Sequence, residues 1–279
     1  MSLDVISYAK INLGLEILFK REDGYHELNT VFKKISLHDS MSIKLREEPG
    51  IEITSNLNIP IKQNLIYKAF TLFQNHYLIN NNGISVNLVK RIPAGAGLGG
   101  GSSNAASVLL AMNELYETHK NISELSNLAL ELGADVPFFL GGNTALGKGI
   151  GENLDYFDLV LPYAMLLVNP GIHVSTKDAY TSLELTGKRK PDNLKELLIK
   201  HRTEAAVWNK FIINDFEKPI FREYPDIADI KAAMYASGAL FALMSGSGST
   251  VFGIFHKAEE AVKAAGNFSK YRTFLAEFV

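Results

Sequence analysis

The chain has 279 residues, of which 47% are hydrophobic, and its 28 basic and 30 acidic side chains leave a formal net charge of −2. This composition can supply a hydrophobic core, and the balanced charge argues against nucleic acid or a membrane surface as a partner. Cysteine does not occur in the sequence, which excludes disulfides, thiol nucleophiles and cysteine-ligated metals.

The N-terminal residues carry no recognisable secretory signal. They read Met-Ser-Leu-Asp and pass directly into strand-like alternation, without the basic and apolar regions of such a signal. The longest apolar run, residues 159–168, is interrupted by Pro162 and is too short to span a bilayer. We therefore expect a cytoplasmic protein, monomeric or homodimeric, with no nucleic-acid or membrane partner.

The chain opens with two predicted strands. Residues 5–19 alternate apolar and polar side chains, and Lys10 and Asn12 lie on the polar face of this strand. A turn follows at Asp23-Gly24, and residues 31–45 have the pattern of a further strand.

Helices and a glycine-rich run come next. Residues 64–77 have helical spacing, and residues 84–89 alternate as a strand. The run Gly95-Ala-Gly-Leu-Gly-Gly-Gly101 leads into a helix that continues to about Tyr116. A second helix is predicted over residues 123–132, before Gly133.

The second half of the chain predicts a mixed region. Glycines between 141 and 151 mark a lobe boundary, and residues 163–168 form a strand. Helices are expected around 193–213 and 227–236, before a final hairpin that pairs 239–244 with 250–255. Strands and helices mix without regular alternation, which indicates an α+β fold with two lobes.

The glycine-rich run has five glycines in seven residues. Its backbone N–H groups can approach a phosphate closely, and the helix that follows adds a favourable dipole. A structural turn before a helix capped by Ser102 or Ser103 is the alternative, but a cap needs fewer glycines. Either hydroxyl can also contact a phosphate or its metal ion.

Two nucleotide-binding fingerprints match this run only in part. Gly95-x-Gly-x-x-Gly has dinucleotide spacing, but Pro93 interrupts the entering strand and no second strand with a ribose-binding acid follows. A Walker loop would need a lysine where Gly101 stands, so a cation must come from elsewhere. The candidates for that cation are Lys10, Lys90 and Lys148.

Other segments each allow a structural and a functional interpretation. Lys10 is either solvated or directed at a ligand, and Asp135 is either a loop or cap acid or a catalytic carboxylate. Tyr25 and His26 follow a turn and have rings that can stack on a base. Residues 245–249 are either a tight turn or a binding loop.

These segments together resemble the three motifs of the GHMP kinase superfamily. The first is Tyr8-Ala-Lys-Ile-Asn-Leu, the second is Pro93-x-Gly-x-Gly-Leu-Gly-Gly-Gly-Ser-Ser-Asn-Ala-Ala, and the third is Met244-Ser-Gly-Ser-Gly-Ser. The resemblance implies an ATP-binding N-terminal domain over 1–155, a ferredoxin-like C-terminal domain over 156–279, and an active site in the cleft between them.

Three further segments resemble one branch of that superfamily. They are Asp23-Gly-Tyr-His, Leu132-Gly-Ala-Asp-Val-Pro-Phe-Phe and Ala145-Leu-Gly-x-Gly-Ile-Gly-Glu. The resemblance implies ATP-dependent phosphorylation of the 2-hydroxyl of 4-diphosphocytidyl-2-C-methyl-D-erythritol in non-mevalonate isoprenoid biosynthesis. The alternatives are a GHMP kinase for another small alcohol and a non-catalytic nucleotide-binding regulator, against which the presence of Lys10 and Asp135 argues.

The resemblance also implies roles for single residues. Asp135 would be the general base, and Lys10 would polarise or steady the acceptor hydroxyl. The residues that would bind ATP are Asn64, Leu65, Lys90, Pro93, Ala94, Gly95, Ala96, Gly97, Leu98, Gly99, Gly100, Gly101, Ser102 and Ser103. The residues that would bind the acceptor are Asn12, Tyr25, His26, Thr176, Tyr180, Gly246, Ser247 and Gly248.

Among these acceptor residues, Tyr25 and His26 would contact the cytosine and Tyr180 would stack on its other side. A helix start capped by Ser175 and Asp178 is the structural alternative for the segment that holds Thr176 and Tyr180. Mg²⁺ is expected with ATP, and Ser102 or Ser103 is its candidate ligand.

Overall fold

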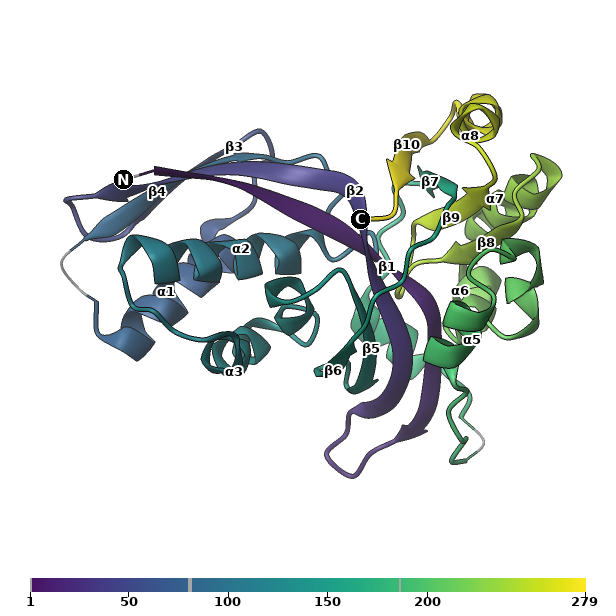
Figure 1. The fold of residues 1–279 in the computed structure, drawn as a ribbon, viewed down its shortest axis with the longest axis horizontal. Coiled ribbons are helices and arrows are strands. Elements are labelled where there is room, and N and C mark those ends of the chain that lie inside the picture. Colours follow the sequence, from purple (N-terminus) through teal and green to yellow (C-terminus); the bar gives the residue numbers. More distant parts are fainter. Residues whose placement is uncertain (1, 80–81, 186) are drawn as a thin grey trace. The chain divides into compact units, whose positions relative to one another are not determined.

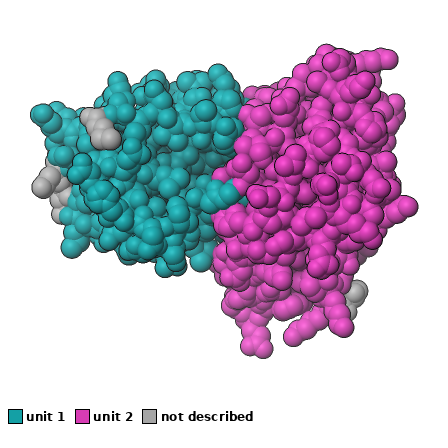
Figure 2. Space-filling view, in the orientation of Figure 1, with its two compact units in different colours: residues 1–9, 38–94, 99–142 teal, residues 10–37, 95–98, 143–279 magenta. Residues whose placement is uncertain are grey.

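The computed structural model describes residues 2–79, 82–185 and 187–279, and the chain forms two compact units. Unit 1 comprises residues 1–9, 38–94 and 99–142, and unit 2 comprises 10–37, 95–98 and 143–279 (Figure 2). This partition differs from the predicted division at residue 155. It differs because the long strands β1 (Ser2–Lys20) and β2 (His26–Arg46), which pair with each other, contribute residues to both units.

Over its described residues, unit 1 combines strands with three α-helices. Strand β3 (Ile51–Ser55) pairs parallel with β4 (Gly83–Val89), and β4 pairs antiparallel with residues 40–46 of β2. The helices pack against one another and lie on one side of these strands in Figure 1. They are α1 (Leu65–Tyr77), α2 (Gly100–Leu115) and α3 (Ile122–Leu132). The 3₁₀ helix Ile61–Gln63 precedes α1, and the 3₁₀ helix Pro137–Leu140 follows α3.

Local sequence explains where two of these helices begin and end. Asn64 caps α1, and a capping box between Asn121 and Glu124 closes the start of α3. Such caps satisfy N–H groups that have no partner within the helix. Gly133 follows the last residue of α3, as the sequence predicts.

Unit 2 contains an antiparallel sheet in the order β10-β7-β9-β8. Its strands are β7 (Ala164–Asn169), β8 (Phe241–Met244), β9 (Val251–Phe255) and β10 (Arg272–Glu277). Helices separate β7 from β8 and β9 from β10, which gives the ferredoxin-like βαββαβ arrangement. The predicted α+β class and ferredoxin-like C-terminal lobe are thus confirmed. Apart from this sheet, β5 (Thr144–Gly149) pairs with residues 28–33 of β2, and β6 (Asn153–Tyr156) pairs with β5.

The predicted hairpin is present, with Met244 opposite Val251 in the β8–β9 pair. The sequence suggested that this hairpin is the last element. That expectation is wrong, because α8 (Ala258–Ala265), the 3₁₀ helix Gly266–Phe268 and β10 follow it. The expected helix over 193–213 is divided into α5 (Leu194–Lys200) and the 3₁₀ helix Ala205–Lys210, because a turn closes between Glu204 N–H and His201 O (3.0 Å). The remaining helices of unit 2 are α4 (Thr176–Thr181), α6 (Glu217–Glu223) and α7 (Pro225–Ala236).

The core of unit 2 lies between its antiparallel sheet and the helices α7 and α8. Ile230 and Met234 of α7 and Ala264 of α8 are buried in one cluster with Leu166 and Phe255 of the sheet. Removing this apolar surface from water is the main force that holds the hairpin against the helices. Across the three described ranges, no helix combines the length and apolar character that crossing a membrane would need.

Candidate functional site

The glycine-rich run leads into α2 through glycines in an unusual backbone conformation. Gly95, Gly97 and Gly99 have φ angles of 62°, 77° and 66°, a region that side chains with a Cβ rarely adopt. Gly99 is the N-cap of α2, so Ser102 and Ser103 lie inside its first turn. The predicted serine cap is therefore wrong, because the left-handed glycine ends the loop three residues earlier.

Residues 95–98 are fixed by other parts of unit 2. The carbonyls of Ala96, Gly97 and Leu98 accept hydrogen bonds from Thr250 N (3.4 Å), Ser245 Oγ (2.9 Å) and Lys10 N (2.9 Å), respectively. A Cβ on Gly97 would lie 2.0 Å from the Ser245 carbonyl oxygen, so only glycine fits there. The first, second and third motifs of the sequence thus meet at this point within unit 2.

In unit 1, a buried carboxylate organises the segments on both sides of the glycine-rich run. Asp39 is 0% exposed, and it accepts hydrogen bonds from the N–H groups of Arg91 (2.7 Å) and Ile92 (2.9 Å). It also accepts one from Asn104 Nδ2 (3.0 Å), in the first turns of α2, and pairs with the ammonium of Lys90. Asp39 therefore joins the segment that enters the run to the helix that leaves it.

Lys90 is buried with this carboxylate. Burial lowers the pKa of Lys90, and the neighbouring Asp39 opposes that shift. A Cβ on Gly100 would lie 2.8 Å from Lys90 Nζ, so the glycine lets the lysine pass beneath the start of α2. The ammonium of Lys90 is engaged inside unit 1, and its contact with ATP stays a prediction.

The other residues predicted for ATP lie around the same helix start. Asn64 caps α1 by accepting the Ile66 N–H (3.0 Å). The side chain of the next residue, Leu65, comes within 3.2 Å of a Cβ built on Gly101. A helix N-terminus next to an apolar side chain offers a place for a phosphate and a surface for a base.

Asp135 lies in the turn between α3 and the 3₁₀ helix Pro137–Leu140. Its side chain is half-buried in unit 1. The 3₁₀ helix packs against both α2 and α3, so the turn that carries Asp135 has a fixed position relative to α2. A carboxylate placed in this way can serve as a base without a change of fold.

Lys10 and Asn12 form a buried polar chain in unit 2. Lys10 Nζ donates to Asn12 Oδ1 (2.7 Å), and Asn12 Nδ2 donates to Thr30 Oγ1 (2.8 Å). The chain ends where Thr30 Oγ1 donates to the Gly14 carbonyl (2.6 Å). Lys10 Nζ also lies 5.1 Å from the centroid of the Phe32 ring. Lys10 is thus an oriented cation and not the solvated side chain that spacing alone allowed.

The aromatic residues predicted for the cytosine are only partly assembled. The rings of His26 and Tyr180 stack directly on each other, with centroids 4.8 Å apart and planes at 17°. Tyr25 is 60% exposed, and its N–H bonds to Asp23 Oδ1 in the turn (3.0 Å). Burial, and then the nearby Lys20, lowers the pKa of His26. Two rings in contact leave no gap, so a base can enter between them only if they separate.

The serine–glycine turn, residues 245–249, bonds to the first residue of α4 and to the segment before it. Thr176 Oγ1 and Ser247 Oγ are 3.1 Å apart, and Ser249 Oγ donates to the Ile172 carbonyl (2.5 Å). Ser175 caps α4 by accepting the Asp178 N–H (3.3 Å), as the structural alternative for this segment proposed. The structure thus brings Thr176 together with Ser247, both predicted for the acceptor.

Comparison with known proteins decides the family. Residues 64–143 match the family model described as GHMP kinases N terminal domain, and residues 190–271 match GHMP kinases C terminal. The chain is 39% identical to a 4-diphosphocytidyl-2-C-methyl-D-erythritol kinase of Thermodesulfovibrio yellowstonii, over 95% of this chain and 94% of the relative. A protein of the same name from Prosthecochloris aestuarii is 40% identical over 99% and 96%. The chain belongs to the GHMP kinase family.

A solved structure supports this assignment. The crystal structure of 4-(cytidine 5′-diphospho)-2C-methyl-D-erythritol kinase matches this GHMP kinase with a TM-score of 0.86 and 35% identity, and the match covers 99% of each chain. Family membership makes the protein an ATP-dependent small-molecule kinase.

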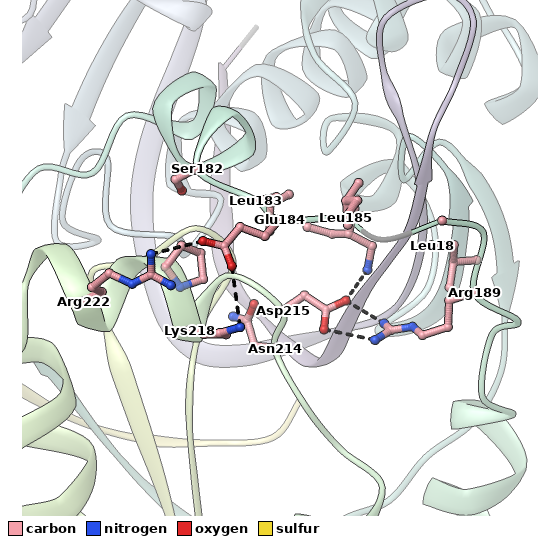
Figure 3. Close-up of a pocket in the computed structure, with 13 residues that line it drawn as sticks. Leu18, Ser182, Leu183, Glu184, Leu185, Arg189, Asn214, Asp215, Lys218 and Arg222 are labelled. Atoms are coloured by element: carbon pink, nitrogen blue, oxygen red, sulfur yellow. Dashed lines mark hydrogen bonds and ion pairs between the residues drawn. The ribbon is translucent and has the colours of Figure 1, made fainter.

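A surface pocket of about 270 Å³ lies elsewhere in unit 2 of this GHMP kinase (Figure 3). Its charged side chains pair with one another. Glu184 bonds to Arg222 (3.1 Å) and lies 3.7 Å from Lys218, while Arg189 bonds to Asp215 (2.5 Å). None of the residues predicted for ATP or the acceptor lines this pocket.

Sequence reasoning missed three residues near the predicted site. Asp39 stands within a predicted strand, where aspartate is disfavoured, and that was the available signal. His173 Nδ1 lies 2.8 Å from a Cβ built on Gly95, and Asn214 bonds to the serine–glycine turn. Neither His173 nor Asn214 stands out in the sequence, because their contacts are distant along the chain.

The metal ligands that the sequence predicts, Ser102 and Ser103, are hydroxyl groups. Within the part of the chain that the structure describes, no three or more histidine, cysteine, aspartate or glutamate side chains gather to hold a metal ion. Ser102 is half-buried and Ser103 is buried, both in the first turn of α2. Mg²⁺ accepts hydroxyl oxygens and keeps several ligands from water and phosphate, so the donor chemistry fits.

Proposed function

We propose that this chain transfers the γ-phosphoryl group of ATP to the 2-hydroxyl of 4-diphosphocytidyl-2-C-methyl-D-erythritol, forming the 2-phosphate and ADP. The reaction belongs to non-mevalonate isoprenoid precursor biosynthesis. The observation that carries the proposal is identity of 39% and 40%, over nearly the full length, to proteins named for this substrate. The segment Asp23-Gly-Tyr-His, which marked that branch in the sequence, supports it.

The start of α2 in unit 1 is the proposed place for the nucleotide phosphates. Its first N–H groups lack intrahelical partners, and the helix dipole favours an anion there. The Asp39–Lys90 pair holds the entering segment, and Leu65 offers an apolar surface for the adenine. Ser102 or Ser103 would hold the Mg²⁺ that accompanies ATP, and the ion would shield the phosphate charge there.

Asp135 and Lys10 are the proposed catalytic residues. Phosphoryl transfer asks mainly for an aligned hydroxyl, a base that accepts its proton and cations that stabilise the phosphoryl charge. Asp135 accepts the proton of the 2-hydroxyl. Lys10, whose orientation is fixed by Asn12 and Phe32, steadies the oxygen as it becomes negative.

The cytidine end of the acceptor is proposed to bind at His26 and Tyr180 in unit 2. Aromatic rings stack on a base without regard to its hydrogen-bonding edge, and neighbouring polar groups then select cytosine. The exposed Tyr25 adds a third ring, while Thr176 and the serine–glycine turn contact the rest of the acceptor. Entry of the base parts the His26–Tyr180 stack.

A coupled ADP-release assay tests the proposal. Purified protein receives Mg-ATP with 4-diphosphocytidyl-2-C-methyl-D-erythritol, and 2-C-methyl-D-erythritol 4-phosphate, which lacks the cytidylyl group, serves as the control acceptor. We expect ADP release with the cytidylylated alcohol alone. Release with another alcohol only would assign a different acceptor within the family, and binding of ATP without any release would favour a non-catalytic regulator.

Both proposed substrates are charged and water-soluble, which suits the cytoplasmic location that the sequence predicts. A monomer or homodimer likewise stays a prediction.

A further inference from the structure

Residues 214–217, Asn-Asp-Phe-Glu, contact several parts of the proposed acceptor site in unit 2. They join the loop after Ile213 to the start of α6. Asn214 and Asp215 also line the pocket in Figure 3, where both are labelled. We refer to these four residues as the NDFE segment. Its side chains contact Met244 and the serine–glycine turn, β1, and the ring of Tyr180.

Asn214 donates hydrogen bonds to backbone carbonyls at the start of the serine–glycine turn. Its Nδ2 donates to the Met244 and Gly246 carbonyls, both at 2.8 Å, and its Oδ1 accepts the Phe216 N–H at 3.0 Å. The residue is 4% exposed. One amide therefore satisfies the last carbonyl of β8, one carbonyl of the turn and one N–H of its own segment, and a buried amide with three such partners has a single orientation.

Glu217 accepts a hydrogen bond from the backbone N–H of Met244, the residue whose carbonyl Asn214 binds. Its Oε1 accepts the Met244 N–H (2.9 Å), and its Oε2 accepts a bond from Lys231 Nζ (2.6 Å). Met244, the last residue of β8, thus has its N–H held by Glu217 and its carbonyl held by Asn214. These two bonds fix the point at which the chain leaves the sheet and enters the turn.

Asp215 connects the NDFE segment to β1. Its N–H donates to the Leu15 carbonyl (3.0 Å), and its Oδ2 accepts the Ile17 N–H (2.6 Å). Arg189 pairs with the same carboxylate, as Figure 3 shows. The strand held here is the one that carries Lys10 and Asn12.

Phe216 connects the NDFE segment to the aromatic stack. Its ring meets Tyr180 edge-to-face, with centroids 4.9 Å apart and planes at 81°. Tyr180 in turn stacks on His26. The edge-to-face contact orients Tyr180 from the side opposite to solvent, because Phe216 is buried in the core of unit 2.

We propose that the NDFE segment is the positioning element of the acceptor site, acting through the serine–glycine turn, β1 and Tyr180. This inference rests on the proposed function. A turn with two glycines in five residues samples many conformations when its carbonyls are released. The acceptor then has to order the turn on binding, which raises its KM. The start of α2 in unit 1 keeps its bond to Asp39, so only the contacts of the turn with Ala96 and Gly97 can affect ATP.

Asn214→Asp tests the inference. The substitution keeps the size of the side chain but replaces the Nδ2 donor with an oxygen that faces two carbonyl oxygens. We expect the KM for 4-diphosphocytidyl-2-C-methyl-D-erythritol to rise about tenfold, the effect of losing buried hydrogen bonds. The KM for ATP should rise less, because the turn contacts the glycine-rich run only at Ala96 and Gly97. Unchanged KM values for both substrates, or an equal rise in both, would overturn the inference.

Asn113→Asp is the matched control. Asn113 also holds a loop from both sides, since its Nδ2 donates to the Lys120 carbonyl (3.0 Å) and its Oδ1 accepts the Lys120 N–H (2.8 Å). It lies in unit 1, at the end of α2 remote from the glycine-rich run. We expect this variant to keep the wild-type KM for both substrates, whatever it loses in stability.

A second variant, Phe216→Leu, covers the case in which Asn214→Asp does not fold. It keeps an apolar side chain in the core but removes the ring that orients Tyr180. A raised KM for the acceptor alone supports the inference, and an unchanged KM overturns it.

Titration of wild type and both NDFE variants with cytidine 5′-diphosphate separates the inference from the proposed function. If wild type binds this probe but phosphorylates another alcohol, the proposed acceptor fails, and weaker probe binding by the variants still supports the positioning role. If wild type and variants bind the probe equally, the positioning role fails.

Discussion

The segment that enters the glycine-rich run and the serine–glycine turn are held in place by opposite chemistry. In residues 90–92 of unit 1, the carboxylate of Asp39 accepts the N–H groups of Arg91 and Ile92 and pairs with Lys90. At the serine–glycine turn in unit 2, the amide of Asn214 donates to the carbonyls of Met244 and Gly246. The first segment is held through its donors by a charge, and the second through its acceptors by a neutral group.

This difference suggests which property of the protein changes when the contacts of each segment are removed. Removing one member of a buried ion pair leaves an uncompensated charge, which costs more than the loss of a neutral hydrogen bond. We therefore expect changes near Asp39 to reduce stability strongly. Changes around Asn214 should appear mainly in acceptor binding.

The largest expected effect is on kcat and comes from Asp135, the proposed catalytic base in unit 1. Asp135→Asn removes the proton acceptor, so kcat should fall by a factor of about 10² to 10⁴, while ATP affinity is retained. Steady-state kinetics and nucleotide titration measure the two quantities. Asp155→Asn, at an exposed carboxylate paired with Lys195, is the control and should keep wild-type kcat. Near-normal turnover in Asp135→Asn would remove Asp135 as the base.

Asp39→Asn tests the buried ion pair between Asp39 and Lys90. The substitution leaves the Lys90 ammonium buried without its counter-charge, so the free energy of unfolding should fall by about 3–5 kcal/mol. Urea unfolding measures this change. The double variant Asp39→Asn, Lys90→Met should regain part of the loss, because it removes the stranded charge. A loss no larger than that of Asn214→Asp would contradict the distinction between the two segments.

Tyr180→Ala tests the recognition role of unit 2. Removing a stacking ring should raise the KM for the cytidylylated acceptor about tenfold, with the KM for ATP as an internal control. Tyr25→Ala should act in the same direction. An unchanged acceptor KM in both variants would show that these rings do not hold the base.

The smallest expected effect is on the pH dependence of the free energy of unfolding. It concerns Lys34, which lies in the part of β2 that belongs to unit 2, whereas Asp39 lies in the part that belongs to unit 1. Burial lowers the pKa of Lys34 from 10.5 to about 8. Between these values the unfolded chain holds a proton that the folded chain has lost, so the free energy of unfolding should rise with pH across this window.

Urea unfolding at several pH values from about 8 to 10 measures that slope. Lys34→Met should flatten it relative to wild type, because the variant has no proton to release at this position. Parallel pH profiles for the two proteins would show that Lys34 does not titrate differently in the folded and unfolded chain.

The sequence by itself determined much of the fold and the outline of the site. Alternation over residues 5–19 and 31–45 predicted β1 and β2, since apolar faces must be buried whatever the packing partner. Glycines before an apolar helical repeat predicted a phosphate-binding start of α2, because both the conformational freedom and the dipole are local properties.

Tertiary structure decided which polar residues hold those elements. Asp39 and Lys90 are 51 positions apart, and Asn214 and Met244 are 30 apart, so no local pattern connects them. The N-cap of α2 is Gly99, and not the serine that the sequence suggested, for a related reason. Contacts of residues 96–98 with Lys10, Ser245 and Thr250 set the path of the loop before the helix begins. Burial and hydrogen-bond partners depend on the whole fold, whereas backbone preferences belong to each residue and its neighbours.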